Sequence, residues 1–163
     1  MVELVRAVGA RTSAIDVSRA ARTTARLRRR HGCPTRLSRA PAMRLLCADD
    51  EEDIRTILAL ALSLDPAFQV EIVGSGAELL ALARVGRYDA FVLDGMMPGM
   101  DGYETCRRLK ADPATAATPV VFLTAKTQRD EMARALLIGA VACLAKPFDP
   151  LTLAGDLRKA LLA

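Results

Sequence analysis

Residues 88–102, with the sequence YDAFVLDGMMPGMDG, indicate the fold of this chain most clearly. The uninterrupted apolar run at residues 90–93 is typical of a β-strand covered on both faces, and we predict a strand at residues 88–93. Asp94 follows that run directly. A single carboxylate at the end of a buried strand is unfavourable unless it is paired or bound to a metal. The stretch therefore predicts a buried strand that ends at a functional carboxylate.

Four further apolar runs of strand length flank this one, and amphipathic segments separate them. We predict these strands at residues 44–48, 69–73, 120–123 and 142–145. Strands that alternate with helices form a parallel sheet with right-handed connections, and helices cover both of its faces. The sequence thus predicts an α/β fold of five β-α units from Met43 onward.

The helices are predicted from apolar spacing and from their end signals. The first ends near Leu64, and one buried face is expected to hold Ile54, Ile57, Leu58, Ala61 and Leu62. The second opens with a capping box, Ser75-x-x-Glu78, and ends near residue 86. The third and fourth are predicted at residues 103–111 and 129–138, and the fifth from Asp149-Pro150. We interpret Gly99 and Gly102 as turn glycines.

Polar side chains follow four of the predicted strands, where ligands bind in sheets of this kind. Asp49 and Asp50 follow the first strand, Asp94 the third, Thr124 the fourth and Lys146 the fifth. Converging carboxylates require a cation, and hard oxygen ligands with room for water suit Mg²⁺. A lysine supplies positive charge for phosphate oxygens, and a threonine hydroxyl supplies a hydrogen bond. The set predicts in-line phosphoryl transfer onto a carboxylate.

These residues belong to motifs that, together, resemble the receiver family of two-component response regulators. The motifs are Asp49-Asp50-Glu51, Asp94-Gly-Met-Met-Pro98-Gly-Met-Asp-Gly102, Thr124-Ala125 and Lys146-Pro147-Phe148. The resemblance covers nearly all of residues 43–163. It implies a three-layer sandwich in which a five-stranded parallel sheet, with the flavodoxin-like strand order 2-1-3-4-5, is covered by five helices.

The resemblance also implies roles at the acidic end of the site. Asp94 would be the phosphoacceptor, with a sensor histidine kinase or a phosphotransfer protein as its donor. Asp50 would bind Mg²⁺ directly and Asp49 largely through water. Asp94 itself and the backbone carbonyl of Met96 would complete the protein ligands of the metal.

The remaining roles lie on the last two strands. Lys146 would contact the phosphoryl group, aimed by a constrained cis peptide to Pro147, and Thr124 would move toward the group after transfer. The family usually has an aromatic residue three positions before this lysine, and here that residue is Cys143. We therefore expect weaker coupling from Thr124 to the surface, or coupling by another route. Inert packing, rather than redox sensing, is the preferred interpretation of the Cys143 thiol.

Met96 and Lys126 occupy the two positions that flank the path of a water attacking the phosphoryl group. A methionine side chain cannot orient that water, so we expect a long-lived acyl phosphate.

The N-terminal segment differs in composition from the rest of the chain. Of the 163 residues, the first 42 hold ten arginines against two acids, a net charge of +8, whereas the remainder carries −4. Such a segment lacks the apolar side chains to offset the entropy of ordering, so we predict a basic, disordered extension before the domain at residues 43–163. The favoured explanation is that residues 1–42 are an artefact of a start codon assigned upstream of Met43. An organelle-targeting peptide and a nucleic-acid-binding arm are the alternatives.

Four widely spaced cysteines form neither a disulfide framework nor a zinc motif. With no apolar run long enough to cross a membrane, these features predict a soluble, cytoplasmic protein.

The chain ends about a dozen residues into its fifth helix, so we expect no DNA-binding or catalytic output domain. The expected function is a single-domain response regulator, not an enzyme, that signals to an unknown partner protein across the face of the fourth helix, fifth strand and fifth helix. Three alternatives stand beside it. A haloacid-dehalogenase-like phosphatase would need an aspartate at the position of Met96; the others are a nucleic-acid binder and a binding module independent of phosphate.

Overall fold

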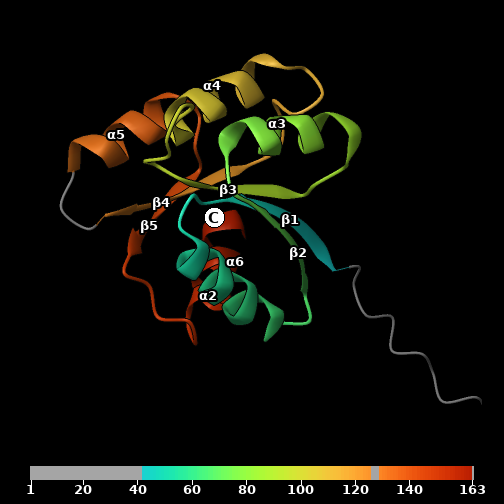
Figure 1. Ribbon diagram of the computed structural model, residues 1–163, viewed down its shortest axis with the longest axis vertical. Helices are drawn as coiled ribbons and strands as arrows, with labels where there is room; N and C mark the ends of the chain where they lie inside the picture. The colour runs from blue at the N-terminus through green and yellow to red at the C-terminus, as the bar shows by residue number, and fades with distance from the viewer. Residues whose placement is uncertain (1–41, 126–128, 163) are drawn as a thin grey trace, which may run out of the picture. The chain divides into compact units, whose positions relative to one another are not determined.

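The computed structural model describes residues 42–125 and 129–162, which contain a five-stranded parallel sheet (Figure 1). The strands are β1 (Met43–Ala48), β2 (Phe68–Val73), β3 (Ala90–Asp94), β4 (Val120–Ala125) and β5 (Ala142–Lys146). Their order in the sheet is β2-β1-β3-β4-β5, and every neighbouring pair is parallel. This confirms the predicted topology. The prediction for the N-terminal extension falls on residues 1–41, outside the described ranges.

Helices cover both faces of the sheet, which confirms the predicted three layers (Figure 1). One face is covered by α2 (Glu52–Ser63) and α6 (Leu153–Leu162). The other is covered by α3 (Gly76–Val85), α4 (Gly102–Ala111) and α5 (Arg129–Leu137).

The core is divided by the central strand β3, all five residues of which are buried. Phe91 and Leu93 face the layer of α3, α4 and α5, whereas Ala90 and Val92 face the layer of α2 and α6. Because the side chains of a strand alternate between faces, a strand covered on both sides is apolar throughout. This is why the uninterrupted run at residues 90–93 predicted a central strand.

Side-chain caps fix the starts of two helices. The oxygen of Ser75 accepts a hydrogen bond from the Glu78 amide at 3.2 Å, as the capping box predicted, while the Glu78 carboxylate accepts from the amide of Gly74. Asp101 caps α4 in the same way, through the Glu104 amide at 2.7 Å. The second cap anchors α4 only seven residues after Asp94, so it fixes the length of the turn beside the predicted site.

Several details differ from the predictions. The third strand begins at Ala90 and not at residue 88. Ile57, predicted to be buried, is 36% exposed, since it lies at the border of the apolar face of α2, beside the loop that contains Phe148. The last helix begins at Leu153, because the residues after Asp149 form a turn in which the Asp149 side chain accepts from the amide of Leu151.

Gly102 is more than a turn residue, so its interpretation is corrected as well. Gly99 does have the positive φ of a turn glycine, +76°. At Gly102, by contrast, a Cβ atom would lie 2.0 Å from the carbonyl oxygen of Asp94. The helix start and the end of β3 thus approach each other so closely that no side chain fits between them.

We predict that Gly102→Ala lowers the free energy of unfolding by about 2 kcal/mol or more, because the added methyl group forces two backbone segments apart. Gly155→Ala in α6 is the matched control, since its Cβ would meet nothing within 4 Å. It should raise stability by about 0.5–1 kcal/mol through helix propensity. Urea unfolding of both variants measures the difference; equal effects would contradict the close approach.

Candidate functional site

The register of the parallel strands brings the predicted site residues to one edge of the sheet. Ala48 of β1 lies opposite Leu93 of β3, so the residues that follow them, Asp49 and Asp94, lie side by side. The last residue of β4 lies opposite the last residue of β5, Lys146. Asp94 and Lys146 end their strands instead of following them, which gives their side chains the rigidity of the sheet.

The ammonium group of Lys146 bridges two carboxylates. Its Nζ lies 2.6 Å from Oδ2 of Asp49 and 2.6 Å from Oδ1 of Asp94. Asp49 is fully buried, Asp94 is nearly so, and the lysine side chain is only 16% exposed. The sequence predicted that Asp94 would be paired or bound to a metal, and the structure pairs it with Lys146, near the C-terminal end of the domain sequence.

Burial and charge act against each other on these groups. Burial raises the pKa of the Asp94 carboxyl above its ordinary value, and the hydrogen bond and charge of Lys146 offset part of that increase. For Lys146, burial alone would lower the pKa of the ammonium group. The hydrogen bonds and charges of Asp49 and Asp94 outweigh burial, so this pKa lies above its usual range. The lysine stays charged.

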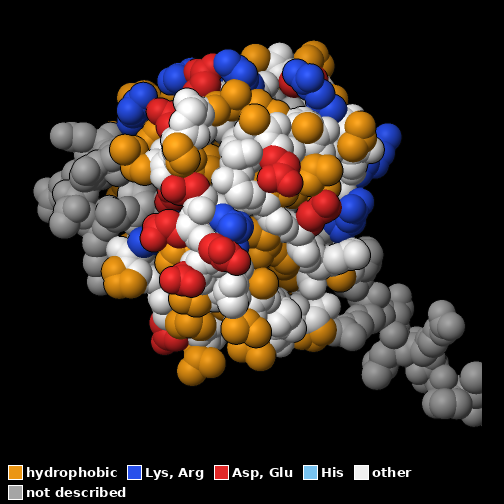
Figure 2. Space-filling model, viewed as in Figure 1, with side chains coloured by type: hydrophobic (Ala, Val, Ile, Leu, Met, Phe, Trp, Pro, Cys, Tyr) orange, Lys and Arg blue, Asp and Glu red, His pale blue; other side chains and the backbone are white. Residues whose placement is uncertain are grey.

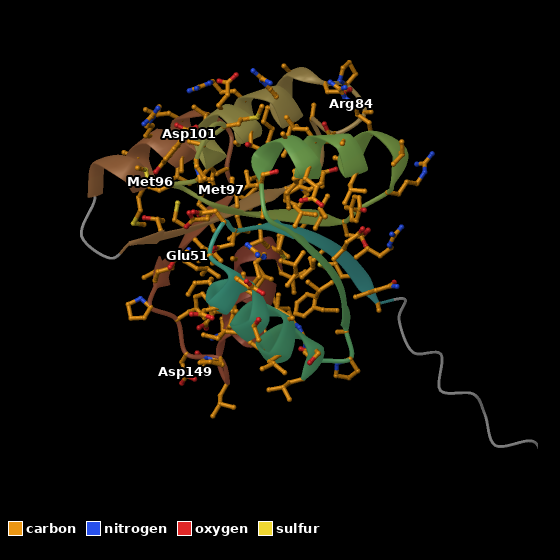
Figure 3. All side chains as sticks on the ribbon, viewed as in Figure 1. Glu51, Arg84, Met96, Met97, Asp101 and Asp149 are labelled. Carbon is orange, nitrogen blue, oxygen red and sulfur yellow. The ribbon has the colours of Figure 1, made fainter. Side chains whose placement is uncertain are left out.

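The turn after β3 positions the second oxygen of Asp94. Oδ2 accepts a hydrogen bond from the backbone amide of Met96 at 3.0 Å. The Met96 side chain is 70% exposed, whereas its neighbour Met97 is buried. Figure 3 shows both methionines at this turn and Glu51 across the strand ends at the start of α2. The position that is predicted to flank the path of an attacking water thus presents an apolar side chain to solvent.

Thr124 and Asp50, the other predicted members, lie at the same edge with different environments. Thr124 is buried and lies within β4, one residue before its end, and so does not follow the strand as predicted. Asp50 follows Asp49 in the turn between β1 and α2, and its side chain is exposed. The predicted site thus has a buried side and a side open to water.

The oxygen atoms of the site fit Mg²⁺. Among the described residues, no three His, Cys, Asp or Glu side chains are gathered tightly enough to enclose a cation by themselves. The predicted ligand set counts three such side chains, Asp49, Asp50 and Asp94, but it places Asp49 on the metal largely through water and adds the backbone carbonyl of Met96. Mg²⁺ commonly binds through one or two carboxylates and keeps several waters, and Asp50 is exposed where water has access.

Acidic side chains gather on the face that includes the strand ends and the start of α2 (Figure 2). Four consecutive acids, Asp50 to Asp53, are all exposed there. Such a concentration of one charge sign raises the local concentration of cations. The face therefore favours approach of a divalent metal.

The Lys146-Pro147 peptide bond is cis, as predicted from the sequence. Cys143, on the same strand, is partly buried, and burial raises the pKa of its thiol. A raised pKa reduces the fraction of reactive thiolate, which agrees with the interpretation of Cys143 as packing.

Tyr103 connects the site to the neighbouring helices, and sequence reasoning missed it. Its ring stacks on Phe122 of β4 at a centroid distance of 5.0 Å, and the guanidinium carbon of Arg134 lies 4.4 Å from the ring centroid. The tyrosine is in the first turn of α4 and is buried. An aromatic contact thus links α4, β4 and α5 near the position where the usual aromatic of β5 is missing.

Known proteins share both the sequence pattern and the fold of this chain. The model of the response regulator receiver domain matches residues 45–158. The chain belongs to the response regulator receiver family. Among curated relatives, the DNA-binding response regulator MtrA of Mycobacterium tuberculosis is 36% identical over 115 residues, which are 71% of this chain and 49% of MtrA. Response regulator PleD of Caulobacter vibrioides is 38% identical over 115 residues, 71% of this chain and 25% of PleD.

Solved receiver structures share the fold. The chemotaxis response regulator CheY4 of Vibrio cholerae is 31% identical in sequence, with a TM-score of 0.68. The superposition covers 73% of this chain and 98% of the CheY4 chain. The receiver domain of sensor histidine kinase PA1611 from Pseudomonas aeruginosa, with a magnesium ion coordinated in its active site cleft, is 26% identical and covers 75% of this chain and 99% of its own, with a TM-score of 0.66. This receiver chain spans about half the length of MtrA and a quarter of PleD.

None of the helices in residues 42–125 and 129–162 is both long and apolar enough to cross a membrane.

We predict that Lys146→Met lowers the free energy of unfolding by roughly 3 kcal/mol, because it leaves two buried carboxylates without a counter-charge. Lys159→Met is the control. Lys159 pairs with Asp156 at 3.2 Å on the exposed side of α6, so its loss should cost less than about 0.5 kcal/mol. Both are measured by urea unfolding without added metal. A loss at Lys146 no larger than that at Lys159 would contradict the account of the ion pair.

Proposed function

We propose that Asp94 accepts a phosphoryl group from the phosphohistidine of a sensor histidine kinase or phosphotransfer protein in the cytoplasm, in a reaction that requires Mg²⁺. The observation that supports this most is the bridge from Lys146 to Asp49 and Asp94 at 2.6 Å. It sets a positive charge against the Asp94 carboxylate and holds that cation where phosphoryl oxygens would arrive.

In the proposed transfer, an Asp94 carboxylate oxygen attacks phosphorus and the P–N bond of the phosphohistidine breaks. The electron pair of that bond returns to the imidazole nitrogen. Lys146 exchanges one carboxylate contact for a phosphoryl oxygen, and the Thr124 hydroxyl donates a hydrogen bond to another. Mg²⁺, bound by Asp49, Asp50, Asp94 and the Met96 carbonyl, would neutralise charge that develops on the transferring group.

An apolar groove beside Lys146 suits a protein donor. Its volume is about 540 Å³, and it runs from α2 to the loop after β5. The lining residues are Glu51, Ile54, Ile57, Lys146, Pro147, Phe148 and Pro150. A donor that covers this groove would bury apolar surface while its phosphohistidine faces Asp94, so binding energy is available to position the reacting atoms.

The output is proposed to be protein contact across the face formed by α5, β5 and α6. Met132, Leu136 and Val141 expose apolar side chains on or beside α5, which is the composition of a contact surface. The chemistry is that of a self-modified switch, not of an enzyme with a separate substrate. A haloacid-dehalogenase-like phosphatase is disfavoured because its second aspartate is replaced by Met96.

Incubation with Mg²⁺ and acetyl phosphate, followed by intact mass, tests the phosphoacceptor role. We predict the addition of one phosphoryl group to the wild type, loss of the addition when Mg²⁺ is chelated, and none in Asp94→Asn. Asp101→Asn is the control, since Asp101 caps α4 and is expected to leave the reaction intact. An unmodified wild type, or equal modification of Asp94→Asn, would remove the proposal.

The exposed methionine at position 96 leads to a prediction about lifetime. Met96→Asn introduces an amide that can orient a water toward the phosphoryl group, so the acyl phosphate should hydrolyse about tenfold faster. Met97→Leu, a similar change at the buried neighbour, should leave the rate nearly unchanged. Decay of the phosphorylated mass after removal of acetyl phosphate gives both rates; an unchanged lifetime in Met96→Asn would argue against control by this side chain.

A further inference from the structure

Arg55 contacts the acidic turn of the site, although nothing in the sequence motifs marks it. A single guanidinium nitrogen, Nη1, donates to the backbone carbonyl of Asp49 at 2.9 Å and to that of Asp50 at 2.7 Å. Arg55 lies in the first turns of α2 and is partly buried, so its side chain folds back over the turn that precedes its own helix.

This turn has few other constraints. The amide of Asp49 donates a hydrogen bond to the carbonyl of Val73, the last residue of β2. This bond follows the last residue pair of the two strands, Ala48 and Val73. The amide of Glu51 donates a hydrogen bond to Oδ1 of Asp49 at 3.0 Å. The carbonyls of Asp49 and Asp50 point instead to Arg55. Hydrogen bonds from a charged donor are stronger than those from a neutral donor. The two bonds from Arg55 therefore fix the orientation of both peptide planes.

The orientation of these peptide planes determines where the two carboxylates lie. The Asp49 carboxylate is further held by Lys146. The Asp50 side chain is exposed, so its direction depends mainly on the backbone to which it is attached. We propose that Arg55 is a positioning residue that holds the turn of Asp49 and Asp50 in the conformation that binds Mg²⁺. The inference rests on the proposed function, because it concerns the metal that this function requires.

If Arg55 acted only through its charge, its removal would change the Mg²⁺ affinity in the opposite direction. A guanidinium next to a cation site repels the metal, so removal of Arg55 would strengthen Mg²⁺ binding if the residue were only a neighbouring charge. Removal of a group that orients metal ligands weakens binding, typically by about 10–100-fold. The sign of the change in Mg²⁺ affinity therefore separates the two roles. If Arg55 only stabilised the fold, its removal would lower stability and leave the Mg²⁺ affinity unchanged.

The test is isothermal titration calorimetry of the full chain with MgCl₂, which suits a protein without tryptophan. Wild type, Arg55→Gln and Arg55→Lys are compared, with thermal unfolding without metal recorded for each. We expect about tenfold weaker Mg²⁺ binding in Arg55→Gln and a smaller loss in Arg55→Lys, which keeps the charge but not the planar donor group. Arg84→Gln on α3, far from the strand ends in Figure 3, should bind Mg²⁺ like the wild type.

Equal or tighter Mg²⁺ binding in both Arg55 variants would overturn the inference, whatever happens to stability. If Arg55→Gln does not fold, Arg55→Lys alone gives the sign. Failure of the proposed function has a different signature, because then the wild type itself would show no Mg²⁺ binding and no transfer to Asp94.

Discussion

Two carboxylates that lie side by side at the end of a parallel sheet repel each other, and the ammonium group of Lys146 is what allows both to be buried. Asp49 and Asp94 are neighbours because β1 and β3 pair in register, and Lys146 reaches them because it ends the edge strand β5. Each of the three side chains is thus held by the sheet. The arrangement joins the start, the middle and the end of the domain through one charge cluster.

The same cluster accounts for the division of the site into a rigid side and an open side. On the buried side are Asp49 and Thr124, enclosed by strands and helices. On the open side are Asp50 and Met96, at turns whose side chains are exposed to solvent. The proposed role of phosphoacceptor needs both properties, since the nucleophile must be oriented and the phosphodonor must approach. The apolar groove beside Lys146 adds a surface on which that approach can be stabilised.

The sequence predicted the architecture and the approach of Asp94 and Lys146 because both follow from short-range patterns. Strands covered on both faces are apolar throughout, and parallel strands place their carboxyl ends together, so Asp94 and Lys146 were expected to meet. Contacts between particular atoms of different segments leave no such pattern in the sequence. Arg55 looks like any surface arginine of a helix, and Gly102 looks like a turn glycine until the distance to the Asp94 carbonyl is known. Ile57 has the spacing of a buried residue but lies at the edge of the helical face.

The central claim is that the carboxylate bridged by Lys146, at position 94, is the one that becomes phosphorylated. Reduction of the phosphorylated protein with borohydride converts an acyl phosphate on aspartate to homoserine, and tandem mass spectrometry of the peptides then locates it. The account predicts homoserine at position 94 alone, formed only when Mg²⁺ was present. Homoserine at Asp49, Asp50 or Asp101, with Asp94 unchanged, would contradict it.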